Sequence, residues 1–125
     1  MLYLIIFIGA GIGGALRHGV NVASSRLWGF GFPYGTLAVN ILGSFVMGLC
    51  AGYFLLRPGL SQHLRLFLTT GVLGGFTTFS AFSLDTAVLV ERHAYMLAAA
   101  YVLGSVIAAI SSFFIGLALF RAAGS

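Results

Sequence analysis

The chain has 125 residues, of which 60% are hydrophobic and only 6% are charged. Soluble domains carry roughly 25% charged residues, so this composition excludes an ordinary water-soluble fold and predicts an integral membrane protein. The formal net charge of +4 comes from arginines that are scattered along the chain. They form no basic stripe, which argues against a nucleic-acid-binding protein.

Four segments are long and apolar enough to be transmembrane helices, since a helix needs about 20 apolar residues to cross the hydrocarbon core. They lie at residues 2–24, 36–56, 64–90 and 95–120. The connectors are short, so we expect a single all-α domain over residues 1–125. The first segment lacks a basic n-region, which predicts a retained span rather than a cleaved signal peptide.

The first span contains a glycine-rich run, Gly9-Ala10-Gly11-Ile12-Gly13-Gly14, that matches G-x-G-x-x-G. A dinucleotide-binding fold also needs a βαβ unit and an acidic residue about 20 positions further on. No acid occurs before Asp85. We therefore expect these glycines to pack helices, because small residues at four-residue spacing let helix backbones approach closely in lipid.

Two polar side chains interrupt the first two spans. Arg17 can snorkel to the interface, or it can face a vestibule where it attracts anions or pairs with Asp85. Asn40 must be hydrogen-bonded if it is buried. Its amide either joins two helices or turns its NH₂ donors toward an ion pathway.

The third span holds the most informative segment, Gly74-Gly75-Phe76-Thr77-Thr78-Phe79-Ser80-Ala81-Phe82. Glycines weaken a helix, so the span is predicted to break near Gly74–Thr77. A break frees backbone carbonyls, and those of Gly74 and Thr77 would suit a cation such as Na⁺.

The second half of this segment suits an anion instead. Phe76, Phe79 and Phe82 are spaced by three and fall near one helical face. The positive edges of aromatic rings attract an anion without trapping it as a full charge would. Ser80 and Ser83 add hydroxyl donors close by.

The fourth span carries a modest polar track, made of Tyr101, Ser105, Ser111 and Ser112. Elsewhere in the chain there is no paired carboxylate and no credible nucleophile with its base. The three histidines share no metal-ligand spacing. The sequence therefore predicts a protein that is not an enzyme.

The arginines give no clear orientation in the membrane. An even number of spans puts both termini on one side, with Arg57, Arg65 and Arg121. The other side receives Arg26 and Arg92, or three arginines if Arg17 near the end of the first span is counted, so the positive-inside rule gives no answer. Either a span is misplaced, or the chain inserts both ways and two opposite copies form an antiparallel dimer.

Three blocks of these spans resemble the CrcB/Fluc family of bacterial fluoride channels. The blocks are Gly13-Gly14-Ala15-Leu16-Arg17, then Gly35-Thr36-Leu37-Ala38-Val39-Asn40 with Gly43, then Gly74 through Ser83. The length and the weak charge bias also agree with the family. Ala81 departs from the family pattern, because it stands where a hydroxyl residue is common.

The resemblance implies a dual-topology, antiparallel homodimer in the bacterial inner membrane, with two pores for passive fluoride export that gives fluoride resistance. It implies a central structural Na⁺ on the carbonyls of Gly74 and Thr77 from both subunits, and it places Arg17 toward a vestibule. The residues it assigns to the fluoride path are Asn40, Phe79 and Phe82, with Ser80, Tyr101 and Ser105 as polar lining.

Two other functions fit a small four-span protein. A multidrug-type exporter coupled to protons needs a carboxylate within the membrane, for which Asp85 is the only candidate. A purely structural subunit of a larger complex would leave the cluster of hydroxyls and phenylalanines unexplained. The fluoride channel is therefore the leading hypothesis.

Overall fold

Four membrane-length helical spans make up the computed structural model, which describes residues 1–29, 31–56, 59, 61–77 and 79–124. Three of the spans are single helices: α1 (Leu2–Trp28), α2 (Tyr34–Leu56) and α6 (Tyr95–Gly124). The remaining span is assembled from α3 (Gln62–Leu66), η1 (Phe67–Leu73), α4 (Gly74–Phe76) and α5 (Phe79–Glu91). All four are long and apolar enough to cross a membrane, which confirms the predicted all-helical class with four spans.

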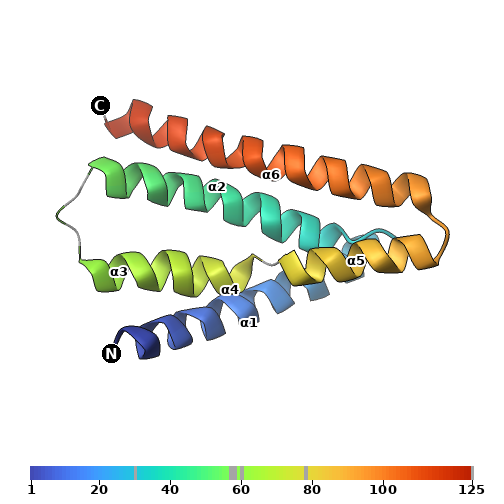
Figure 1. Ribbon diagram of the computed structural model, residues 1–125, viewed down its shortest axis with the longest axis horizontal. Helices are drawn as coiled ribbons and strands as arrows, with labels where there is room; N and C mark the ends of the chain where they lie inside the picture. Colours follow the sequence, from blue (N-terminus) through green and yellow to red (C-terminus); the bar gives the residue numbers. More distant parts are fainter. Residues whose placement is uncertain (30, 57–58, 60, 78, 125) are drawn as a thin grey trace.

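Both termini lie at the same end of the bundle, as an even number of spans requires (Figure 1). The α1–α2 and α5–α6 connections lie at the opposite end, which we call the loop end. Residues 57, 58 and 60 of the second predicted connector lie outside the described residues, and so does Thr78 of the third span.

Helices pack in two extensive pairs. α2 and α6 run in the same direction and contact each other along their length (Figure 1). α1 packs against η1 and α4 of the third span. The third span therefore lies with one face on α1 and another toward α2 and α6.

Glycines allow these pairs to come into backbone contact. A Cβ at Gly13 would overlap the carbonyl oxygen of Val72, and one at Gly48 would overlap that of Phe113. Such close approach is the usual role of small residues between membrane helices. By contrast, Gly11 has nothing within 4 Å of its Cβ position, so only some of the glycines serve packing.

The third span is not a continuous α-helix. η1 is a π-helical segment, a rare conformation, and α4 is followed by Thr77 in an extended conformation with φ −86° and ψ 152°. The break thus lies at the C-terminal edge of the predicted range, and Gly74 itself is helical with φ −64° and ψ −37°. Gly75 is also helical, and it packs closely on α1, since a Cβ there would overlap the carbonyl of Ala10.

The fully buried core is small. Its largest side chains are Val39, Leu89 and Tyr101. Most large apolar side chains of α1 and α6 are exposed, including Phe7 and Ile107. Lipid tails are as apolar as these side chains, so a bundle in a bilayer gains little by burying them.

Candidate functional site

A cavity of about 240 Å³ lies at the break, between α2, the start of α5 and α6. We call it the break cavity. Its walls are formed by side chains of three kinds, namely amide or hydroxyl groups, phenylalanine rings and small apolar groups. They are Asn40, Ser44, Thr77, Phe79, Phe82, Ser105, Val106 and Ala109. The structure therefore brings together Asn40, Phe79, Phe82 and Ser105, which the sequence analysis had assigned to one path.

Helix geometry explains why these groups converge. Residues four apart on a helix share a face, so Asn40 and Ser44 of α2 both reach the cavity. Ser105 and Ala109 of α6 do the same from the opposite wall. The break then lets α5 start afresh at Phe79, which directs a second set of side chains into the same space.

Ser105 is the most unusual group in this wall. It is only 5% exposed, and its Oγ is buried without a hydrogen-bond partner among the described residues. An unsatisfied buried hydroxyl costs about 1–3 kcal/mol. A polar ligand in the cavity would remove that cost.

Aromatic rings continue from the cavity toward the loop end. The centroids of Phe79 and Phe82 are 5.5 Å apart with the planes tilted by 50°. Phe82 lies 5.1 Å from Tyr101, and Phe32 meets Tyr101 edge-on at 5.5 Å. This chain of offset rings presents edges as well as faces, and ring edges carry partial positive charge.

Tyr101 connects the rings to a carboxylate. It is 1% exposed, and its hydroxyl donates a hydrogen bond of 3.2 Å to Oδ2 of Asp85. A buried tyrosine hydroxyl normally needs such a partner. The pairing ties α5 to α6 at the loop-end side of the break cavity.

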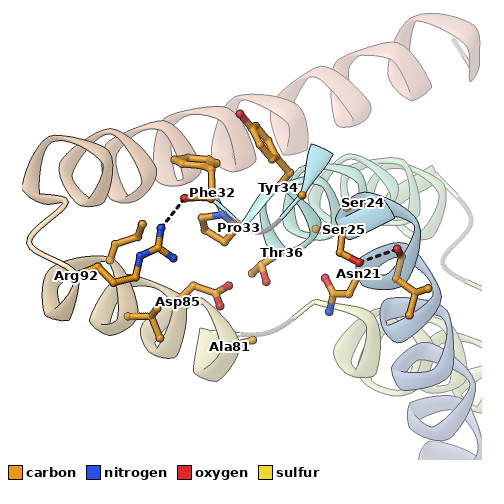
Figure 2. Close-up of a pocket in the computed structure, with 16 residues that line it drawn as sticks. Asn21, Ser24, Ser25, Phe32, Pro33, Tyr34, Thr36, Ala81, Asp85 and Arg92 are labelled. Carbon is orange, nitrogen blue, oxygen red and sulfur yellow. Dashed lines mark hydrogen bonds between the residues drawn. The ribbon is translucent and has the colours of Figure 1, made fainter. Parts of the chain in front are cut away.

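A second cavity, of about 410 Å³, opens at the loop end, and we call it the mouth cavity. Figure 2 shows Asn21, Thr36 and Asp85 directed toward its middle. Arg92 lines another part of the wall and donates from Nη2 to the carbonyl oxygen of Gly31 at 3.1 Å (Figure 2). Polar groups thus extend from the mouth cavity toward Tyr101 and the break cavity.

Arg17 reaches the broken span rather than a carboxylate. Its Nε donates to the carbonyl oxygen of Gly75 at 3.3 Å. Within the described residues no ion pair joins Arg17 to Asp85, whose carboxylate accepts from Tyr101 instead. Arg17 and Asp85 are therefore not paired within the single chain, and the placement of Arg17 toward a vestibule stays a prediction.

The residues just before the break are held by local hydrogen bonds. Both the backbone N–H and the Oγ1 of Thr77 donate to the carbonyl oxygen of Leu73, each at 2.9 Å. Thr77 then leaves the helix, so its own carbonyl is not part of a regular helical ladder. Backbone carbonyls at a helix break are oxygen ligands of the kind that Na⁺ takes in membrane proteins.

Three predicted path residues, Ser80, Ser83 and Tyr101, lie outside the described lining of the break cavity. Ser80 and Ser83 are exposed on α5, and neither belongs to the described lining of either cavity. In their place the structure adds Ser44 and the side chain of Thr77. The four-residue spacing of Thr36, Asn40 and Ser44 in the sequence is the signal that would have found Ser44.

Four spans, a broken third span and a cavity beside the break that is lined by amide, hydroxyl and ring groups define a small multi-pass membrane protein. A family model described as "CrcB-like protein, Camphor Resistance (CrcB)" matches residues 4–117. The chain belongs to this CrcB family, which confirms the resemblance seen in the sequence.

Similar proteins match over nearly the whole chain. The chain is 60% identical over 122 residues to the fluoride-specific ion channel FluC of Rhodopseudomonas palustris (strain BisB5), with 98% of each chain covered. It is 58% identical over 121 residues to the protein of the same name from Methylobacterium nodulans, with 97% of each covered. These relatives are named as ion channels, a non-enzymatic function. Together with the four spans, they place the protein as a multi-pass protein of the bacterial inner membrane.

Proposed function

We propose that the protein is a fluoride-selective channel that lets fluoride leave the cell passively. Relatives that are 58–60% identical carry the name fluoride-specific ion channel. The observation that carries the proposal is the break cavity, where amide, hydroxyl and ring-edge groups meet beside an unpartnered buried hydroxyl. Fluoride enters a cell as the neutral acid and dissociates there, so a passive exit lowers cytoplasmic fluoride and gives resistance.

The chemistry of the walls suits a small, strongly hydrated anion. Fluoride must exchange its water for several donors, which Asn40 and Ser105 supply from facing helices. The rings of Phe79 and Phe82 add partial positive charge without the trapping strength of a cation. Chloride is larger, so its exclusion would need a second copy that narrows the cavity of about 240 Å³.

The proposed channel is an antiparallel homodimer with two pores at its interface. Phe79 supports this because it lines the break cavity and is nevertheless 78% exposed in the single chain. A second copy would cover this ring and complete the pore wall. The arginines are nearly balanced between the two ends of the bundle. The positive-inside rule therefore favours neither orientation, which permits two copies in opposite orientations.

A structural Na⁺ at the centre of the dimer completes the proposal. The carbonyls of Gly74 and Thr77 from both copies would hold it, and an all-oxygen donor set is what a hard cation requires. When bound, the ion would supply positive charge that joins the two broken spans. Replacing sodium by a larger organic cation should lower the thermal stability of the purified dimer, whereas unchanged stability would count against the ion.

A proton-coupled exporter is not favoured. Such a protein needs a membrane-embedded carboxylate that alternates between proton and substrate. Asp85 is instead engaged by Tyr101 at the edge of the mouth cavity. The relatives that match nearly the whole chain are named as channels.

Fluoride efflux from liposomes that contain the purified protein tests the proposal. The vesicles are loaded with fluoride or chloride, and release is followed with an ion-selective electrode after a potassium ionophore is added. We expect fluoride release far above that of protein-free vesicles and little chloride release. Absence of fluoride release, or equal release of the two halides, would refute the proposal.

A further inference from the structure

Ser44 occupies the third position of a polar stripe on α2. Thr36, Asn40 and Ser44 follow one another at four-residue intervals, so they share the helical face that packs against α6. Asn40 and Ser44 both line the break cavity, one turn apart. Ser44 therefore extends the donor groups of α2 beyond Asn40, toward the end of the bundle that holds the termini.

Hydroxyl groups in this protein divide into two kinds. Thr69, Thr77 and Thr86 each donate to the carbonyl four residues earlier, at 2.7, 2.9 and 2.9 Å. This bond to the helix's own backbone is the usual way to satisfy a hydroxyl in a membrane helix. These three hydroxyls need no ligand.

Ser105 and Ser44 make no such backbone bond within the described part of the chain. The Oγ of Ser105 is buried without a hydrogen-bond partner there, whereas Ser44 is only partly buried in the single chain. The two residues line the break cavity from the neighbouring helices α2 and α6. Hydroxyls left without partners in an apolar surrounding are costly unless a ligand accepts from them.

On α6, the residues that follow Ser105 in the cavity lining are apolar. One turn beyond Ser105 on α6 stands Ala109, and Val106 lies beside it. These side chains offer no donor. An anion that moves past Asn40 and Ser105 thus finds Ser44 as the remaining side-chain donor among the described lining residues on these two helices.

We infer that Ser44 is an anion-coordinating residue that, with Ser105, forms a binding position for a small halide at the far end of the break cavity. Its hydroxyl rotates freely, so it can donate to fluoride while its oxygen still accepts. This role for Ser44 rests on the proposed function of the protein as a fluoride channel.

Fluoride efflux from proteoliposomes tests the inference with three variants. Ser44→Ala should lower the fluoride rate about tenfold, which is the factor expected when one hydrogen bond to an ion is lost. Thr70→Ala removes a hydroxyl from an exposed site on η1 and should stay within about twofold of the wild type. Ser44→Ala combined with Ala109→Ser places a donor on the facing wall and should recover most of the loss, which a merely structural role for Ser44 would not produce.

The outcomes separate this inference from the proposed function. Fluoride release by the wild type with an unchanged Ser44→Ala rate would overturn the role of Ser44 alone, and so would a failure of Ala109→Ser to restore the rate. No release by the wild type would overturn both. Ser44→Cys keeps the side-chain volume but is a weak donor, so it should show the same loss even if Ser44→Ala assembles poorly.

Discussion

The two faces of the broken third span are built in opposite ways. On the face toward α1, backbone meets backbone, because Gly13 and Gly75 leave no room for side chains. On the face toward α2 and α6, side chains hold the helices apart and leave the break cavity. The same segment is thus anchored on one face and hollow on the other.

This difference indicates how the site is kept in place. The anchored face fixes the residues before the break through the α1 contacts and the Arg17 bond to Gly75. The hollow face can then present Asn40, Phe79 and Ser105 from helices whose positions are already set. Functional groups held on rigid elements are positioned more accurately than groups on loops.

The anchored face should be the more sensitive to added volume. Gly13→Leu places a Cβ on the carbonyl of Val72 and within 2.7 Å of the N–H nitrogen of Phe76. Backbone atoms cannot give way as a flexible side chain can, so we expect a destabilisation of roughly 3 kcal/mol or more. Thermal unfolding in detergent measures the effect, and fluoride efflux should be lost with the fold.

Gly11→Leu is the matched control on the same helix. Nothing lies within 4 Å of its Cβ position, and leucine is a better helix former than glycine. Its stability should equal or exceed that of the wild type. Equal destabilisation by the two substitutions would contradict the anchored-face account.

On the hollow face, fluoride efflux should depend on the chemistry of the lining side chains. Asn40→Ala removes an amide donor from the break cavity and should lower fluoride efflux about ten- to a hundredfold, since hydrogen bonds to ions are stronger than neutral ones. Gel filtration should show unchanged assembly. Gln62→Ala, which removes an exposed amide at the start of α3, serves as control, and a wild-type rate in Asn40→Ala would remove this residue from the path.

A substitution at Arg17 tests whether its bond to Gly75 connects α1 to the break in the third span. Arg17→Gln keeps side-chain donors but loses the charge that strengthens the bond to Gly75, so we expect a loss of about 1 kcal/mol in stability. The sodium concentration that gives half of the maximal thermal stabilisation should rise as well. Arg26→Gln, at an exposed position on the same helix, should change neither quantity, and a sodium dependence unaffected by Arg17→Gln would disconnect this residue from the break.

Asp85 should have the smallest effect on fluoride efflux. Asp85→Asn keeps an oxygen that accepts from Tyr101 and removes one negative charge from the mouth cavity. We expect fluoride efflux within about twofold of the wild type, with any change upward, because an anion is no longer repelled. Abolished fluoride efflux in a well-folded variant would show that the carboxylate is essential and would revive the exporter hypothesis.

Much of the fold was predictable because membrane helices can be recognised in a sequence by their length and hydropathy. The four spans, the shared side of the termini and the packing role of the glycines all follow from the apolar runs and small-residue spacing. The π-helical η1 was not predictable, since no local propensity specifies it. The break falls at Thr77 and not at Gly74, and Gly75 between them is helical and packs on Ala10 of α1.

The site was predictable where the family resemblance grouped residues from different spans. It assigned Asn40, Phe79, Phe82 and Ser105 to one path, and these four line one cavity. Ser80 and Ser83 do not, because their direction depends on how α5 restarts after the break. The bond of Arg17 to Gly75 spans 58 positions in the chain, and such contacts follow from tertiary packing alone.

The central claim is that fluoride crosses the membrane through the break cavity, and filling that cavity tests it most directly. Ala109→Phe puts a ring into the cavity from α6, whereas Ile110→Phe adds a ring at the next position, which is 55% exposed on the outer face. Fluoride efflux is measured for both variants after gel filtration shows intact assembly. We predict that Ala109→Phe lowers efflux to the level of protein-free vesicles while Ile110→Phe conducts like the wild type. Wild-type efflux through a correctly assembled Ala109→Phe protein would contradict the account.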